Sequence, residues 1–243
     1  MKLVGERRAL AAAVFAFYFL LMFMNAMLGP EQTAKALYAL AGVYGLAFFG
    51  LVAGYFWARW YSVGVAIFGL IVAVVGVWQM GAFEPVLIFF GGTHLAAAVF
   101  LWGDRMSEPY EGQHAWRERY HMDDNAVQRL GRSVMRAGVS LPFVLLYGLM
   151  PRPEGGALAA LAVVGLTLVG FGGLVKLRTW GVLALGLAGA TLAMVAGPHL
   201  THVGSVGAGI AHVGTLPPLL LGALLIATAA PFVRPMGRWI AAR

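Results

Sequence analysis

The chain has 243 residues, of which 60% are hydrophobic and only 11% are charged. An ordinary soluble domain carries about 25% charged residues, so this composition excludes a typical water-soluble enzyme. The formal net charge is +7, but the basic residues flank apolar runs instead of forming one face, which argues against a nucleic-acid partner. The absence of cysteine excludes disulfides, thiolate metal sites and cysteine nucleophiles.

Eight apolar runs follow one another along the chain, separated by short polar breaks. Because a hydrocarbon core about 30 Å thick takes roughly 20 apolar residues to cross as a helix, the runs predict an all-α, polytopic membrane protein with eight transmembrane helices. The first follows MKLVGERR, which resembles the start of a signal peptide, but no clear small-x-small cleavage pattern comes after it, so we predict a retained helix. The predicted helices are 9–28, 36–58, 63–83, 85–102, 137–150, 156–175, 179–197 and 216–233.

The basic residues are distributed unevenly between the two sides of this map. Of the 17 Lys and Arg residues, all but Lys35 and Arg152 fall on the side that holds both termini. The positive-inside rule places that side in the cytoplasm. The sequence therefore predicts a multi-pass protein of a bacterial-type plasma (inner) membrane, with cytoplasmic N- and C-termini.

The two halves of the map resemble each other. Segments 45–70 and 165–189 each read as an apolar helix, a tight basic turn with an aromatic residue, and a Gly-rich helix. A duplication of four helices would relate the halves by an axis along the membrane normal. The alternative is that helices rich in Gly, Ala and Leu look alike by composition. The predicted organisation is a first half (1–102), a cytoplasmic segment with an amphipathic helix (103–136) and a second half (137–243).

Glycines are abundant, 33 in all, and most of them lie inside the predicted helices. They predict close packing between helices, with Gly50-x-x-x-Gly54 as one small-xxx-small site. Helix packing is a sufficient explanation for this pattern.

The end of the central segment is amphipathic. Val127, Leu130 and Val134 fall on one helical face. Asp123 or Asp124 is placed to cap the start of this helix. We predict a short helix at the inner leaflet that leads into the fifth transmembrane helix, or alternatively a solvated connector. The residues predicted to contact anionic lipid headgroups lie on the opposite face and are Arg129, Arg132 and Arg136.

Histidines are the best candidates for chemistry. His94 lies near the middle of the fourth predicted helix, and three more occupy the outer segment before the last helix: His199, His202 and His212. Neutral imidazole is the commonest metal ligand and also ligates haem iron, so these four residues form the candidate ligand or metal site. Haem or a divalent metal is the cofactor they would hold. The alternative is that His94 hydrogen-bonds a neighbouring helix and the other three face water.

One known family provides a comparison for His94. The eight-helix architecture with two four-helix halves and both ends inside is similar to that of the haem A synthases. The stretch THLAAAVFLW around His94 resembles the histidine context of helix 4 in that family. The resemblance implies histidine ligation of haem. The family also uses histidines in helices 2 and 6, where this chain has none, so the resemblance covers about one helix.

Three classes of function remain. No charged residue lies near the centre of a predicted span, which argues against an ion-coupled transporter or proton pump. The sequence favours a non-catalytic membrane protein, either an accessory or assembly subunit or a binder of lipid or apolar small molecules. Its expected partners are membrane lipid and other membrane protein subunits. A haem or metal redox protein and a transporter of an uncharged solute are the alternatives.

Overall fold

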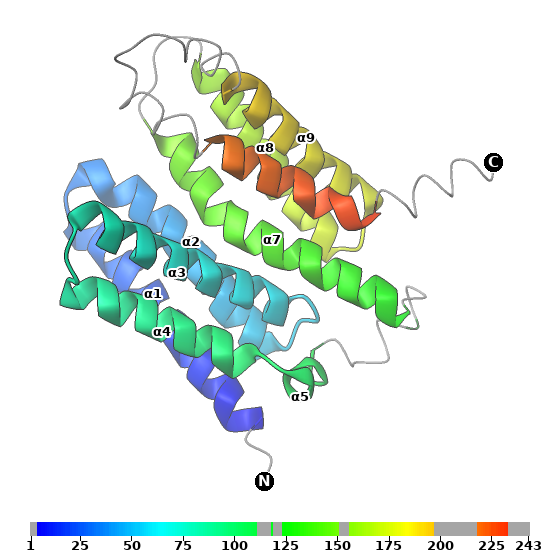
Figure 1. The fold of residues 1–243 in the computed structure, drawn as a ribbon, viewed down its shortest axis with the longest axis horizontal. Helices are drawn as coiled ribbons and strands as arrows, with labels where there is room; N and C mark the ends of the chain where they lie inside the picture. The colour runs from blue at the N-terminus through cyan, green and yellow to red at the C-terminus, as the bar shows by residue number, and fades with distance from the viewer. Residues whose placement is uncertain (1–3, 111–117, 119–122, 151–155, 197–217, 233–243) are drawn as a thin grey trace. The chain divides into compact units, whose positions relative to one another are not determined.

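The computed structural model describes residues 4–110, 118, 123–150, 156–196 and 218–232. The described part is helical and contains no strand, which confirms the all-α prediction (Figure 1). The chain divides into two compact units, residues 1–131 and 132–243. The predicted three-part division at residues 102 and 136 stays a prediction.

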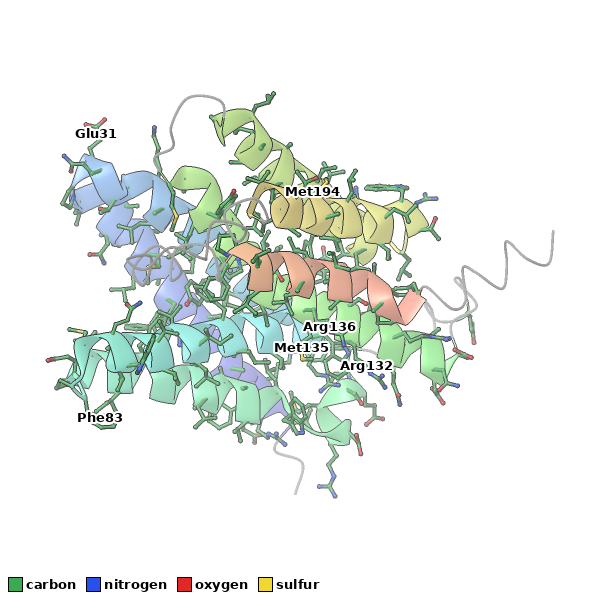
Figure 2. The ribbon with its side chains drawn as sticks, turned by 45° about the horizontal axis from the view of Figure 1, so that its top comes forward. Glu31, Phe83, Arg132, Met135, Arg136 and Met194 are labelled. Carbon is green, nitrogen blue, oxygen red and sulfur yellow. The ribbon has the colours of Figure 1, made fainter. Side chains whose placement is uncertain are left out.

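The first unit contains four long helices. Helix α1 contacts α2 and α4, and α3 also contacts α2 and α4, so the four form a bundle around a shared interior. Figure 2 shows Glu31 and Phe83 at one end of this bundle, where α2 begins and α3 has just ended. The helices are α1 (Val4–Leu28), α2 (Glu31–Ala53), α3 (Ala58–Met80) and α4 (Pro85–Leu101).

The turn between α2 and α3 corrects the sequence prediction. Helix α2 ends at Ala53 and is capped by Gly54, which has a left-handed φ of 72° and whose N–H bonds to Leu51 O at 3.2 Å. The next residue, Tyr55, donates its N–H to Gly50 O at 3.2 Å, which completes a Schellman motif. Gly54 is therefore the cap of α2. The predicted break between the helices 36–58 and 63–83 was therefore misplaced, since residues 59–62 already lie in α3.

A short segment follows α4 at the end of the bundle where α2 ends and α3 begins. It contains α5 (Asp104–Ser107) and continues to Tyr110. The side chains of Met106 and Tyr110 are fully buried. The Tyr110 hydroxyl donates to Leu51 O at 3.5 Å, so this part of the predicted cytoplasmic segment packs against the bundle.

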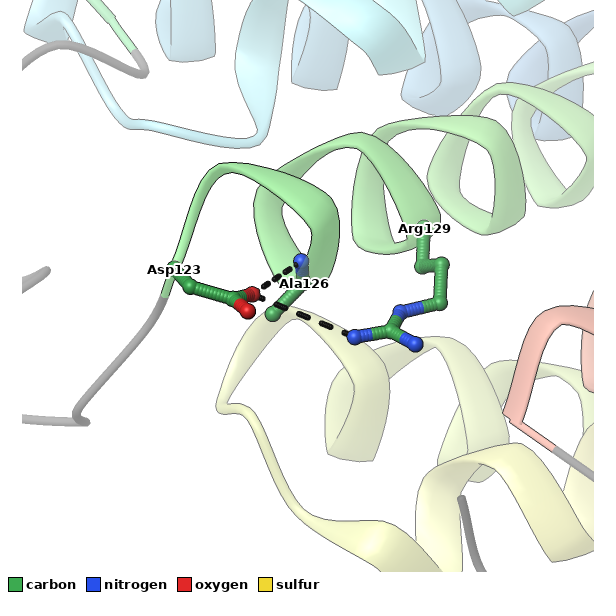
Figure 3. A network of polar contacts seen from close by, with 3 residues as sticks. All are labelled: Asp123, Ala126 and Arg129. Carbon is green, nitrogen blue, oxygen red and sulfur yellow. Dashed lines mark hydrogen bonds and ion pairs between the residues drawn. The ribbon is translucent and has the colours of Figure 1, made fainter. Parts of the chain in front are cut away.

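Helix α7 (Asp124–Leu149) is one continuous helix, and the division between the two units falls within it. The predicted amphipathic segment and the predicted helix 137–150 are joined in this one helix, because nothing between Val134 and Ala137 interrupts the backbone bonding. Asp123 accepts the Ala126 N–H at 2.6 Å, which confirms the predicted cap (Figure 3). The predicted apolar face is buried, since Val127, Leu130 and Val134 are at most 6% exposed.

In the second unit, the described residues after α7 form α8 (Gly156–Val175), α9 (Thr179–Ala196) and a last described helix, Pro218–Phe232. Glycine brings these backbones close together. A Cβ atom on Gly173 would lie 2.7 Å from the Gly181 Cα, and one on Gly189 would lie 2.6 Å from the Gly222 carbonyl oxygen. The close packing that the glycine content predicted is therefore present between α8 and α9, and between α9 and the last helix.

The turn between α8 and α9 repeats the geometry of the turn between α2 and α3. Leu177 has a left-handed φ of 57°, and its N–H bonds to Leu174 O at 3.0 Å. Arg178 then donates its N–H to Gly173 O at 2.8 Å. These are the same two bonds that end α2, and they place Leu177 in the position of Gly54.

Four described helices are long and apolar enough to cross a membrane: α1, α2, α3 and α8. Shorter apolar helices are Pro85–Leu101, Thr179–Val195 and Pro218–Phe232. Many large apolar side chains on these helices are exposed, among them Leu158 (79%) and Val86 (77%). Such a surface is costly in water and favourable in lipid, so the helices indicate a membrane protein.

Candidate functional site

His94 lies in the interior of the first bundle and is fully buried. Its Nε2 is 2.9 Å from the Tyr44 hydroxyl of α2, and its Nδ1 is 2.7 Å from the Phe90 carbonyl oxygen one turn earlier in α4. A carbonyl oxygen only accepts, so Nδ1 carries the proton. In the neutral ring, Nε2 therefore accepts the Tyr44 O–H. Both ring nitrogens are thus bound to protein groups.

A second hydrogen bond lies beside the first. The Tyr18 hydroxyl of α1 is 2.6 Å from Thr93 Oγ1 of α4. The Tyr18 ring centroid is 4.6 Å from that of His94, and the Tyr44 centroid is 5.7 Å away. We call Tyr18, Tyr44, Thr93 and His94 the tyrosine–histidine cluster. It joins α1, α2 and α4 through polar contacts that carry no formal charge.

Helix α3 contributes to the cluster through the absence of a side chain. A Cβ atom on Gly69 would collide with three atoms of the His94 ring. The imidazole therefore lies against the backbone of α3, and each of the four helices supplies one wall of its surroundings. The arrangement holds a polar ring in an apolar interior, which costs free energy unless each polar atom has a partner.

Arginines bind the ends of helices in the first unit. Arg8 donates to the carbonyl oxygens of Leu51 (2.7 Å) and Val52 (2.8 Å) at the end of α2. The last carbonyls of a helix lack intrahelical partners and carry the negative end of the helix dipole, so cations stabilise them. At the end of α4, Arg7 donates to Val99 and Trp102, and Arg59 donates to Leu101.

The same end of the bundle has cation–π contacts. The Arg59 guanidinium lies 4.2 Å from the Trp60 ring centroid, and that of Arg8 lies 5.3 Å from the Tyr110 centroid. Burial raises the pKa of Tyr110, and the positive charges of Arg8 and Arg59 oppose that rise. The phenol therefore stays protonated at neutral pH and can donate to Leu51 O.

The three arginines predicted to contact lipid lie on α7 in different surroundings. Arg129 is 3.9 Å from the Asp123 carboxylate (Figure 3), and Arg132 is exposed. Arg136 donates to the carbonyl of Ala227 in the last helix, and nearby Ser133 donates to that of Thr228. Figure 2 shows the positions of Arg132 and Arg136 on α7. Arg136 thus stabilises a helix of its own unit, and the lipid prediction for this set stays a prediction.

The other predicted histidines, His199, His202 and His212, lie outside the described residues. Within the described ranges, no group of three or more His, Cys, Asp or Glu side chains is placed to hold a metal ion. The ligand-site prediction for the four histidines therefore stays a prediction. Of the set, the structure places His94 alone, and its Nε2 is bound to Tyr44.

Three residues of the cluster, Tyr18, Tyr44 and Thr93, were not predicted as site residues. Tyr18 and Tyr44 lie in the apolar runs of the first two predicted helices. A polar-tipped aromatic side chain in such a run is a signal, because a hydroxyl in hydrocarbon needs a partner. The identity of that partner was not predictable, since Tyr44 and His94 are 50 residues apart.

Comparisons with known proteins gave no match to any protein-family model, curated protein or solved structure. The described chain is all-helical, and its apolar helices indicate an integral membrane protein of more than one span.

Proposed function

We propose that this chain is a non-catalytic integral membrane protein, an accessory or assembly subunit that binds other membrane proteins and lipid. The observation that supports this most strongly is the pairing of His94. Its two ring nitrogens bind Tyr44 and the Phe90 carbonyl, which is the arrangement of a side chain that holds helices together. Arg7, Arg8 and Arg59 likewise bind helix ends.

The proposal includes eight membrane-crossing helices with both termini in the cytoplasm of a bacterial-type cell. Four are the long apolar helices, and the others are α4, α7, α9 and Pro218–Phe232. Helix α4 has 17 residues, which at 1.5 Å per residue span about 26 Å. Local thinning of a core about 30 Å thick accommodates that difference at modest cost.

We also propose that the two four-helix halves arose by duplication. One constant offset in residue number then relates the second and third helices of the first half to their counterparts in the second half. Aligning Gly54 with Leu177 sets the offset. It also aligns Trp57 with Trp180, and the segment Gly50–Leu51–Val52 with Gly173–Leu174–Val175. In both turns the tryptophan ring lies against the aligned glycine: a Cβ atom would lie 3.1 Å from Trp57 Cη2 at Gly50, and 2.8 Å from Trp180 Cη2 at Gly173.

The main competing function is a haem or metal redox protein that uses the four histidines. Ligation of iron or zinc by His94 through Nε2 would require the Tyr44 hydroxyl to move away, because it occupies that lone pair. The test below therefore distinguishes the proposed function from this competing function and from the transport of an uncharged solute.

The test is purification of the tagged chain from native membranes into lipid nanodiscs, followed by native mass spectrometry, a visible absorption spectrum and metal analysis. The proposal predicts a stoichiometric membrane-protein partner and bound lipid, without a haem absorption band. A stoichiometric haem or metal would overturn it in favour of the redox function. Saturable uptake of a solute by vesicles that contain the chain alone would overturn it in favour of transport.

A further inference from the structure

The turn between α8 and α9 exposes two cations next to an indole ring. Lys176 and Arg178 are exposed, and Trp180 is 47% exposed. Within the described residues, neither cation lies within ion-pair distance of a carboxylate. The two positive charges are therefore available to a ligand from outside the chain.

The matching turn in the first unit is closed by the protein itself. Arg8 fills the space at the end of α2 by donating to Leu51 and Val52. Trp57, the counterpart of Trp180, is only 9% exposed and stacks on Tyr55 with ring centroids 5.6 Å apart. The same backbone turn is thus covered by protein in one unit and exposed in the other.

The backbone of the exposed turn is also strained. Leu177 takes the left-handed conformation with a φ of 57°, where the first unit has glycine. This conformation is unfavourable for a residue with a Cβ atom. Such strain persists where the surrounding structure requires the conformation, and it is commoner at binding sites than elsewhere.

We propose that Lys176, Arg178 and Trp180 form a binding site for the headgroup of an anionic phospholipid. The turn ends α8, one of the long apolar helices, so it lies where a span leaves the hydrocarbon. The two cations match the negative charge of a lipid phosphate, and the cytoplasmic leaflet is the anionic one. Tryptophan favours the headgroup level because its ring is apolar and its N–H donates a hydrogen bond.

This inference rests on the proposed function and deepens it by naming one ligand class and its residues. It differs from the earlier expectation for α7, where Arg136 already binds the Ala227 carbonyl and Arg129 lies near Asp123. The occupant we propose is a lipid headgroup rather than free phosphate. The reason is that the indole ring supplies an apolar contact for the glycerol and acyl region, which inorganic phosphate lacks.

The experiment compares lipid retention by full-length variants in nanodiscs made from equal amounts of phosphatidylcholine and phosphatidylglycerol. After transfer to detergent, native mass spectrometry counts the bound phosphatidylglycerol. For Lys176→Gln with Arg178→Gln, we expect weaker binding by roughly fivefold per cation and about 30-fold for the pair. The charge-preserving pair Lys176→Arg with Arg178→Lys should keep the lipid, and it also reports on folding.

The matched control is Lys35→Gln with Arg105→Gln, which removes the same charge from exposed positions elsewhere. It should retain phosphatidylglycerol as wild type does. Equal loss in both Gln pairs, or loss in neither, would overturn the site. Complete displacement by inorganic phosphate at equal concentration would also overturn it, because the ligand would then be the free anion. The test of the proposed function detects a membrane-protein partner, whereas this experiment detects bound lipid. A negative result for the lipid site can therefore be distinguished from a negative result for the proposed function.

Discussion

The turn that joins α2 to α3 and the turn that joins α8 to α9 share their backbone bonds but differ in what covers them. In the first unit, glycine takes the left-handed position and Arg8 covers the helix end. In the second, Leu177 takes that position, and Lys176 and Arg178 are exposed. The comparison teaches that the same backbone conformation occurs both in a turn whose helix end is covered by an arginine and in a turn whose basic side chains are exposed.

The interiors of the two units also differ in the contacts between their helices. The first bundle is held by polar contacts within the tyrosine–histidine cluster. The second has close backbone approach, with Gly181 against Gly173 and Gly222 against Gly189, beside the hydrogen bonds from Ser133 and Arg136 to the last helix. In lipid, where burying apolar surface gains little between helices, both hydrogen bonds and small residues are effective ways to associate them.

The largest expected effect comes from filling the glycine contact in the second unit. In Gly181→Ala, the new methyl group would collide with the backbone of Gly173 and Leu174, which cannot rotate away. Overpacking of this kind costs about 1–3 kcal/mol, and we expect the upper end. Thermal unfolding in detergent measures it. Gly172→Ala is the matched control, since its methyl would meet nothing within 4 Å. Equal melting temperatures for the two variants would show that close backbone contact does not hold this hairpin.

The next effect belongs to the polar interior of the first unit. Tyr44→Phe leaves His94 Nε2 without its donor, and an unsatisfied buried acceptor costs about 1–3 kcal/mol. Hydrogen bonds between helices in membranes contribute energies at the lower end of this range, so we expect Tyr44→Phe to lower the free energy of unfolding by about 1–2 kcal/mol. Unfolding in mixed micelles measures the difference. Tyr38→Phe, at a position 46% exposed, should change stability by less than about 0.5 kcal/mol. If Tyr38→Phe lowered the stability as much as Tyr44→Phe, the result would contradict a stabilising role of the tyrosine–histidine cluster.

A smaller effect tests the sealed helix end. Arg8→Gln removes the guanidinium from the carbonyls of Leu51 and Val52, and we expect a loss of about 1 kcal/mol. Arg105→Gln removes an equal charge at an exposed position and should be nearly neutral. Amide hydrogen exchange should show faster opening of the end of α2 in the first variant alone. Unaltered exchange there would mean that water satisfies these carbonyls equally well.

The smallest effect sharpens the comparison of the two turns. Gly54→Ala places a Cβ atom at a φ of 72° and should cost about 1 kcal/mol. Leu177→Gly removes that strain at a φ of 57° and should stabilise by up to about 1 kcal/mol. Opposite signs in melting temperature are the expected result. The equivalence of the two turns would be contradicted if both changes lowered it.

Much of the helical map was predictable, because long apolar runs report helices directly. The predicted range 156–175 coincides with α8, and the Asp123 cap was read from the residue type. The turn at Gly54 was missed because the apolar run continues through Trp57, and the predicted break instead begins at the charged residue Arg59. Hydropathy does not distinguish a buried arginine that caps a neighbouring helix from one that faces water.

The candidate site was predictable only in part. His94 stands out as a titratable residue within an apolar run, whereas its contacts with Tyr44 and Tyr18 depend on which helices pack together. No spacing along the chain encodes that packing. The collision of a Gly69 methyl with the imidazole is of the same kind, because it joins residues on two helices.

The most direct test of the proposed structural role is His94→Gln, with protein partners, lipid, haem and metal measured in the purified chain and compared with wild type. We predict a less stable protein that retains the same partner and lipid, with no haem or metal difference between the two. The reason is that His94 uses both ring nitrogens to bind its own helices. A haem absorption band or stoichiometric metal in wild type that disappears in His94→Gln would contradict the account and assign His94 as a ligand.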